Sequence, residues 1–156
     1  MQTLAKFSVE EILPLIGAGL PKFLLPVGDS FCWVKASSSR LECLKRNQTC
    51  VWCKRKGNIF LLQQHVPGPP RVGLNCFLEN CPWCALRNRN HIKGDVPHLN
   101  LYHQNRVGGL LLMTQDHIFP QWAGGSSEQE NLQTMCRECN QRKGGDLPEH
   151  LRKPMR

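Results

Sequence analysis

Apolar residues in this chain gather in short runs that Gly, Pro and polar clusters separate, a pattern typical of strands joined by loops. Four such runs are predicted to be strands, over residues 30–35, 58–64, 98–103 and 107–114. Residues 98–103 alternate between apolar and polar positions, and a turn with Gly-Gly follows them. We therefore expect the last two runs to pair as a hairpin that delivers Asp116 and His117 at its end.

The N-terminal segment carries a helix-start signal. Ser8 is followed three residues later by Glu11, the pattern of a capping box, and apolar residues come next. A helix is expected from Val9 to about Ala18, with Pro14 as a flaw in it. This predicts an N-terminal helical arm over residues 1–39, which would pack on the core, bind a partner or read DNA. We favour packing on the core.

Two further helices are expected. Residues 40–47 fit one or two helical turns after a cluster of serines, and residues 137–143 fit a short helix that Gly144 and Gly145 stop. Strands and helices together predict the α+β class.

The charge balance favours a polyanionic partner. The 156 residues suit one domain, or a small domain plus an arm, and the formal net charge is +8. The apolar patch at 12–25 is interrupted by prolines and a lysine, and two glutamates precede it where a secretory signal would carry positive charge. Because no run is long enough to span a bilayer, we expect a soluble cytoplasmic protein without a membrane partner.

Cysteine spacing points to zinc. Six of the nine cysteines form three Cys-x-x-Cys pairs, and two intervening residues let both sulfurs reach one tetrahedral ion. The odd number of cysteines argues against a disulfide framework. One pair, Cys50 and Cys53, precedes a basic turn and has the form of a zinc knuckle. A second group could hold its own zinc; it consists of Cys76, Cys81, Cys84 and His91.

Residues 113–145 carry a motif in which order and spacing matter together. The segment resembles the HNH nuclease family, the ββα-metal fold, through Asp116, His117, Ile118, Pro120, Gly124, Gly125, Asn131, Leu132, Cys136, Cys139, Asn140, Lys143 and Gly144. A looser match reaches back to residues 46–53. The resemblance implies a small ββα-metal (HNH) nuclease core with structural zinc over residues 40–146, a Cys-rich insertion at 68–97 and a basic tail at 147–156.

The resemblance also implies roles for individual residues. His117 would be the general base, while Asp116 and Asn140 would hold a catalytic Mg²⁺ or Mn²⁺ ion. Adjacent strand residues point to opposite sides, so Asp116 and His117 can serve different roles. Asn140 stands where the family name has its last histidine, and an amide oxygen suits a hard ion. Asn131 would hydrogen-bond across the loop and help to fix the histidine.

The resemblance further implies a closed structural zinc site, separate from the catalytic ion. Cys136 and Cys139 would share it with Cys50 and Cys53, which we favour, or with Cys81 and Cys84. Basic residues near these elements are expected to contact phosphates, or else to solvate a turn and a helix face; they are Lys54, Arg55, Lys56, Arg137, Arg142 and Lys143.

The sequence therefore predicts an endonuclease that hydrolyses phosphodiester bonds in nucleic acid, with double-stranded DNA as the favoured substrate. Cleavage would leave 3′-hydroxyl and 5′-phosphate ends, and a homodimer would let such an enzyme cut both strands. The alternatives are a non-catalytic zinc-ribbon module that binds nucleic acid, a toxin or effector nuclease, and a thiol-redox protein.

Overall fold

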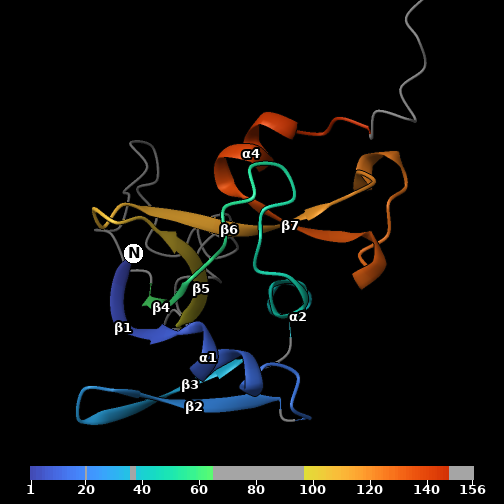
Figure 1. The fold of residues 1–156 in the computed structure, drawn as a ribbon. Helices are drawn as coiled ribbons and strands as arrows, with labels where there is room; N and C mark the ends of the chain where they lie inside the picture. The colour runs from blue at the N-terminus through green and yellow to red at the C-terminus, as the bar shows by residue number, and fades with distance from the viewer. Residues whose placement is uncertain (20, 36–37, 65–96, 148–156) are drawn as a thin grey trace, which may run out of the picture.

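A five-stranded antiparallel sheet forms the centre of the molecule. The computed structural model describes residues 1–19, 21–35, 38–64 and 97–147. The strand order is β1-β4-β5-β6-β7, and a separate hairpin joins β2 and β3 (Figure 1). The strands are β1 (Gln2–Ser8), β2 (Lys22–Val27), β3 (Ser30–Lys35), β4 (Ile59–Gln64), β5 (His98–Gln104), β6 (Leu110–His117) and β7 (Leu132–Cys136).

Three α-helices and three 3-10 turns complete the described part of the chain. The helices are α1 (Val9–Ile12), α2 (Ser39–Arg46) and α4 (Arg137–Lys143), and the 3-10 turns are Leu13–Leu15, Gln121–Ala123 and Gln129–Asn131. Sheet and helices confirm the α+β class. None of the helices in the described ranges has the length and apolar character needed to cross a bilayer.

The prediction of an N-terminal helical arm is wrong. The capping box at Ser8 does form, but α1 ends at Ile12 and a 3-10 turn that contains Pro14 follows it. Proline lacks the N–H that a longer α-helix would need at this point. The preceding residues form β1 and pair with β4, so that Phe7 lies opposite Phe60. Pairing with a strand about 50 residues away is a long-range event that a local pattern does not reveal.

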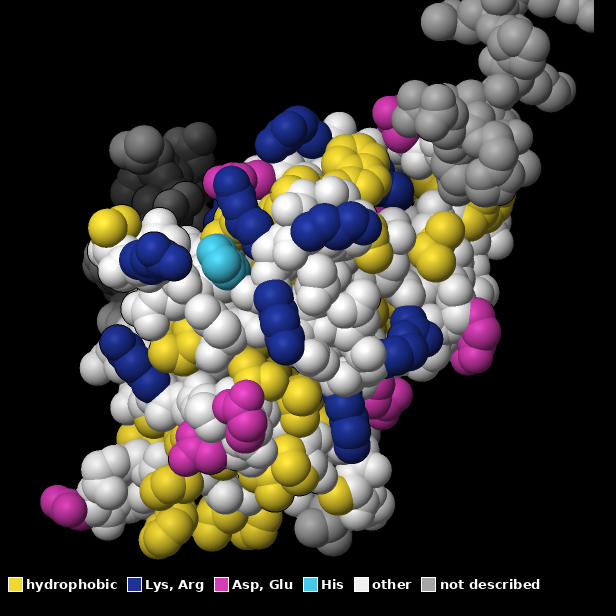
Figure 2. Space-filling view, in the orientation of Figure 1, with side chains coloured by type: hydrophobic (Ala, Val, Ile, Leu, Met, Phe, Trp, Pro, Cys, Tyr) yellow, Lys and Arg dark blue, Asp and Glu magenta, His cyan; other side chains and the backbone are white. Residues whose placement is uncertain are grey.

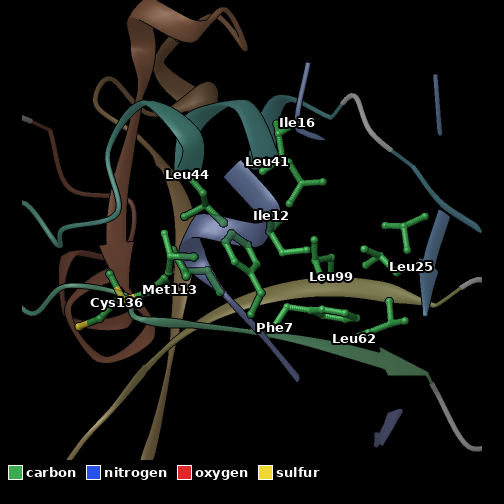
Figure 3. Close-up of a cluster of buried hydrophobic side chains, with 14 of the residues drawn as sticks. Phe7, Ile12, Ile16, Leu25, Leu41, Leu44, Leu62, Leu99, Met113 and Cys136 are labelled. Atoms are coloured by element: carbon green, nitrogen blue, oxygen red, sulfur yellow. The ribbon is translucent and has the colours of Figure 1, made fainter. Parts of the chain in front are cut away.

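Packing of this segment on the core, which we favoured, is confirmed. Ile12 and Ile16 are fully buried and belong to the main apolar cluster. In Figure 3 the side chains of Phe7 and Ile12 from this segment lie with Leu44 of α2 and Leu99 of β5. The core therefore occupies the space between the sheet, helices α1 and α2, and the inner face of the β2–β3 hairpin.

The predicted strands are found with small changes at their ends. Residues 30–35 form β3 as predicted, and the predicted hairpin is the β5–β6 pair. β6 extends to His117, so Asp116 and His117 lie within the strand rather than beyond it. β7, like β1 and β2, was not among the strands predicted from the sequence. The helix at 137–143 has its predicted limits, and Gly144 ends it with a φ of 56°.

Candidate active site and metal centre

Strands β6 and β7 and helix α4 form a compact ββα unit. The two strands pair antiparallel, with Asp116 opposite Gln133 and His117 opposite Leu132. Helix α4 begins directly after β7 and packs on β6, as Figure 1 shows. The Asn140 side chain joins the two elements, because its Nδ2 donates to Thr114 Oγ1 at 2.9 Å. This unit brings Asp116, His117 and Asn140 to one junction.

Asp116 and Lys143 form a buried ion pair. Their side chains are 7% and 8% exposed, and Lys143 Nζ lies 3.1 Å from Asp116 Oδ2 and 3.2 Å from Oδ1. Gln133 Nε2 donates to Oδ2 at 2.7 Å, and Lys143 Nζ also donates to the backbone oxygen of His117 at 2.8 Å. Lys143, which we expected to contact phosphate, therefore has its ammonium group beneath the surface, where it fixes the end of β6.

The imidazole of His117 is left with an unused polar atom. Its Nε2 is buried and has no hydrogen-bond partner in the part of the chain that the structure describes. Buried polar atoms in folded proteins nearly always have a partner, so such an atom commonly marks a position where a water or ligand binds. The alternation of strand residues sends this side chain to the side opposite Asp116.

Asn131 ties down the loop that follows β6. Its Oδ1 accepts from the backbone N–H of Phe119 at 2.8 Å, while its Nδ2 donates to the backbone oxygens of Phe119 and Ser126 at 3.0 and 2.7 Å. Glycine at 125 is required here, since a Cβ would overlap the carbonyl oxygen of Phe119. These contacts hold the loop across the end of β6, next to His117.

Among the described residues, the Asn140 side chain makes its hydrogen bonds through the amide nitrogen. Nδ2 donates to Thr114 Oγ1 and, at 3.4 Å, to the backbone oxygen of Gln115. Thr114 and Asp116 are two residues apart on β6 and share one face of the strand. Asn140 thus lies on the same side of β6 as Asp116.

Four cysteines come together at the junction of α4 with the rest of the molecule. The Sγ atoms of Cys50, Cys53, Cys136 and Cys139 all lie within 4.8 Å of one another. A tetrahedral zinc ion with Zn–S bonds of about 2.3 Å requires sulfurs about 3.8 Å apart. The Cys53 and Cys136 sulfurs are 3.7 Å apart, so the cluster fits zinc. The structure brings the favoured pair, Cys50 and Cys53, together with Cys136 and Cys139; the alternative pair, Cys81 and Cys84, lies outside the described residues.

Backbone geometry builds the knuckle that carries Cys50 and Cys53. Cys50 N–H donates to the Arg55 oxygen at 2.9 Å, and Lys54 N–H donates to the Cys50 oxygen at 3.0 Å. Lys54 adopts a φ of 62°, which is uncommon for a side-chain-bearing residue and closes the turn tightly. Gly57 then passes so close to β5 that a Cβ would lie 2.5 Å from Leu101 Cγ.

The thiols titrate unequally because their surroundings differ. Burial by itself raises the pKa of Cys50, but hydrogen bonds from the backbone N–H groups of Cys136, Cys53 and Trp52 outweigh it and lower that pKa to about 7. Burial and the neighbouring thiols raise the pKa of Cys139 to about 12, and burial also raises that of Cys136. A zinc ion between the four sulfurs would offset the effect of burial and hold the cysteines as thiolates.

The remaining basic residues occupy different environments. Arg55 Nη1 lies 3.0 Å from Glu138 Oε2, so this exposed pair joins the knuckle to α4. Lys54 Nζ donates to the Val51 oxygen at 2.7 Å, whereas Lys56, Arg137 and Arg142 are exposed and are absent from the ion pairs of the described residues. Figure 2 shows Lys and Arg side chains spread over the upper and middle parts of this face.

Three contributors to this site were missed from the sequence. Gln133 and Thr114 are uncharged strand residues whose type gives no signal of their contacts with Asp116 and Asn140. The pairing of Lys143 with Asp116 was missed because the two are 27 residues apart and meet only when α4 packs on β6.

Comparison with known proteins links part of the chain to a nuclease family. The model of a family described as HNH endonuclease matches residues 111–156, which include β7, α4 and all of β6 except Leu110. No curated protein matches the chain, and no solved structure matches it. Together with the four-cysteine cluster, this match shows that the chain carries an HNH endonuclease family domain at residues 111–156.

Proposed function

We propose that this protein is a metal-dependent endonuclease that hydrolyses phosphodiester bonds in nucleic acid, with double-stranded DNA as its substrate. The family match implies a nuclease. The observation that carries the proposal is the ββα junction at the end of β6, where His117 has a buried Nε2 without a partner in the described chain while Asp116 and Asn140 lie on the other side of the strand.

His117 is the proposed general base. A neutral imidazole can take a proton from water near physiological pH, and its free Nε2 is the atom available for this step. The loop tied down by Asn131 and the hydrogen bond from Lys143 to the His117 oxygen both restrain the backbone that carries the ring. Restraint of this kind reduces the cost of orienting the base during the reaction.

Asp116 and Asn140 are the proposed ligands of the catalytic ion. A carboxylate and an amide oxygen are hard donors that suit Mg²⁺ or Mn²⁺, and such an ion, when bound, offsets charge on the phosphoryl group and the departing oxygen. A carboxylate has about four lone-pair positions, so the contacts from Lys143 and Gln133 leave room for another. The nearby ammonium group nevertheless repels a cation, and Lys143 therefore weakens metal binding at this site.

Exposed cations on the knuckle and α4 are the proposed phosphate contacts. Lys54 and Lys56 on the knuckle and Arg137 and Arg142 on α4 belong to two elements that the cysteine cluster and the Arg55–Glu138 pair hold together. The net charge of +8 favours a polyanion over the whole molecule. Zinc is proposed to be structural, since four cysteine ligands leave no open position.

Plasmid cleavage with Mg²⁺ or Mn²⁺ tests the proposal. His117→Ala should lose activity about 100-fold or more, the usual range for a general base, and should still bind DNA. His98→Ala is a matched control, because His98 is exposed on β5 and has no place in the proposed site. Equal cleavage by the parent protein and His117→Ala would refute the role of His117.

One observation favours a second candidate, a non-catalytic zinc-stapled module that binds nucleic acid. The carboxylate expected to hold the catalytic ion is already paired with Lys143 and hydrogen-bonded to Gln133. This candidate predicts that the parent protein binds DNA and that neither Mg²⁺ nor Mn²⁺ leads to cleavage. Binding without any cleavage of DNA or RNA would therefore decide in its favour.

A further inference from the structure

The β2–β3 hairpin is apolar on both faces. On the inner face Phe23, Leu25 and Val34 are buried in the core. On the outer face Phe31 and Trp33 are 68% and 60% exposed, and Leu24 is 43% exposed. A strand on the surface of a protein usually alternates between buried apolar and exposed polar residues, so the outer face departs from the normal pattern.

The exposed residues form one continuous patch. Leu24 lies directly opposite Trp33, and Pro26 lies directly opposite Phe31, in the antiparallel register. Residues two apart on a strand share a face, so these four side chains, which we call the hairpin patch, lie together. Figure 2 shows hydrophobic side chains gathered at the lower end of the molecule, where Figure 1 places β2 and β3. Contiguous exposed apolar patches commonly mark interaction sites.

We propose that the hairpin patch is the surface through which two copies of this chain associate about a two-fold axis. The charges at the two ends of the hairpin support a second copy of the chain as the partner. Lys22 and Lys35 lie opposite each other at the open end, and Asp29 lies in the turn at the other end. Stacking two hairpins antiparallel places each Asp29 against the two lysines of the other copy, whereas parallel stacking would bring like charges together.

Nucleic acid fits this patch less well than a second copy does. Exposed aromatic rings can stack on bases, but such platforms combine them with a basic groove. Here Asp29 is at the turn, and Glu10 and Glu11 are exposed on α1, which lies beside the hairpin in Figure 1. Two of the four patch residues, Leu24 and Pro26, are aliphatic. Within the hairpin, Lys22 and Lys35 are the two cations and both lie at one end, so the patch does not form the basic groove of such a platform and better suits an apolar protein surface.

The size of the patch sets the expected strength of association. The exposed fractions of Leu24, Phe31 and Trp33, applied to side chains of roughly 150–250 Å² each, give on the order of 350 Å² per copy. Stable interfaces bury about 800 Å² per partner. The dimer is therefore expected to be reversible and to depend on protein concentration.

Sedimentation velocity of the full chain over a concentration series tests the proposal. No nucleic acid is present, so the result is independent of the proposed nuclease activity. Trp33→Glu should weaken the dimer about tenfold or more, because a charge would be buried at its centre. Val107→Glu is the matched control, since Val107 is 90% exposed in the β5–β6 turn and should leave the dimer unchanged.

Charge reversal provides a second test that leaves the apolar residues intact. Asp29→Lys alone, and Lys22→Glu with Lys35→Glu in one chain, should each weaken self-association, and mixing the two variants should restore a heterodimer. A parent protein that stays monomeric, a dimer unaffected by Trp33→Glu, or variants that do not recover on mixing would each overturn the proposal. A monomer whose DNA affinity falls in Trp33→Glu but not in Val107→Glu would assign the patch to nucleic acid instead.

Discussion

Replacing Lys143 with methionine should destabilise the protein by removing one partner of a buried ion pair. Methionine keeps most of the length of the side chain but leaves the Asp116 carboxylate, 7% exposed, without its cation. Removing one partner of a buried pair typically costs about 3–5 kcal/mol. Gln133 still donates to Asp116, so we expect the lower end of that range, about 3 kcal/mol. For a chain of this length this corresponds to a fall in Tm of roughly 6–12 °C.

Urea unfolding monitored by circular dichroism measures this change, with two variants beside Lys143→Met. Arg142→Met removes an exposed cation from the same helix and should change stability by less than about 0.5 kcal/mol. Adding Asp116→Asn to Lys143→Met removes the orphaned charge and should recover part of the loss. If Lys143→Met is as stable as the parent protein, or if the double variant is less stable than Lys143→Met, the reasoning is refuted.

The same variant tests whether Asp116 is a metal ligand. If Lys143 opposes cation binding, Mn²⁺ should raise the Tm of Lys143→Met more than that of the parent protein, because a ligand stabilises the state that it binds more tightly. Mn²⁺ should have no such effect on the double variant with Asp116→Asn. Equal shifts in all three proteins would contradict a role for Asp116 in holding the ion.

Three further predictions concern the elements around the site. Elemental analysis should find one zinc ion fewer per chain in Cys136→Ser than in the parent protein, whereas Cys32→Ser on β3 should keep the parent's zinc content; an unchanged zinc content in Cys136→Ser would contradict the four-cysteine site. Gly57→Ala should lower the free energy of unfolding by about 1–3 kcal/mol, because the added methyl group would lie 2.5 Å from Leu101 Cγ, and an unchanged urea midpoint would refute this close contact. Asn131→Ala should speed hydrogen exchange at the backbone N–H of Phe119 and cost about 2 kcal/mol, since three hydrogen bonds are lost; unchanged protection at Phe119 would show that the loop is held by other means.

Local sequence patterns were sufficient to predict an element where residues close together in the chain determine its conformation. The limits of β3 and α4, the capping box at Ser8 and the stop at Gly144 all depend on residues within a few positions of one another. The motif from Asp116 to Gly144 could also be recognised from the sequence, because its residues lie in one continuous segment, and an HNH endonuclease family model matches that segment. Such patterns can be recognised in the sequence, because the backbone conformation that they indicate is determined by steric contacts and hydrogen bonds between residues close together in the chain.

The tertiary structure determined the contacts between distant residues that local sequence patterns left open or did not predict. The three cysteine pairs have identical spacing, so only the path of the chain could place Cys50 and Cys53 next to Cys136 and Cys139. The first residues became an edge strand because β4 offers them a partner, and Lys143 became a buried partner of Asp116 rather than a surface cation because α4 packs on β6. In each case the stabilising contact joins residues far apart in the chain, and its free energy exists only once the whole fold has brought them together.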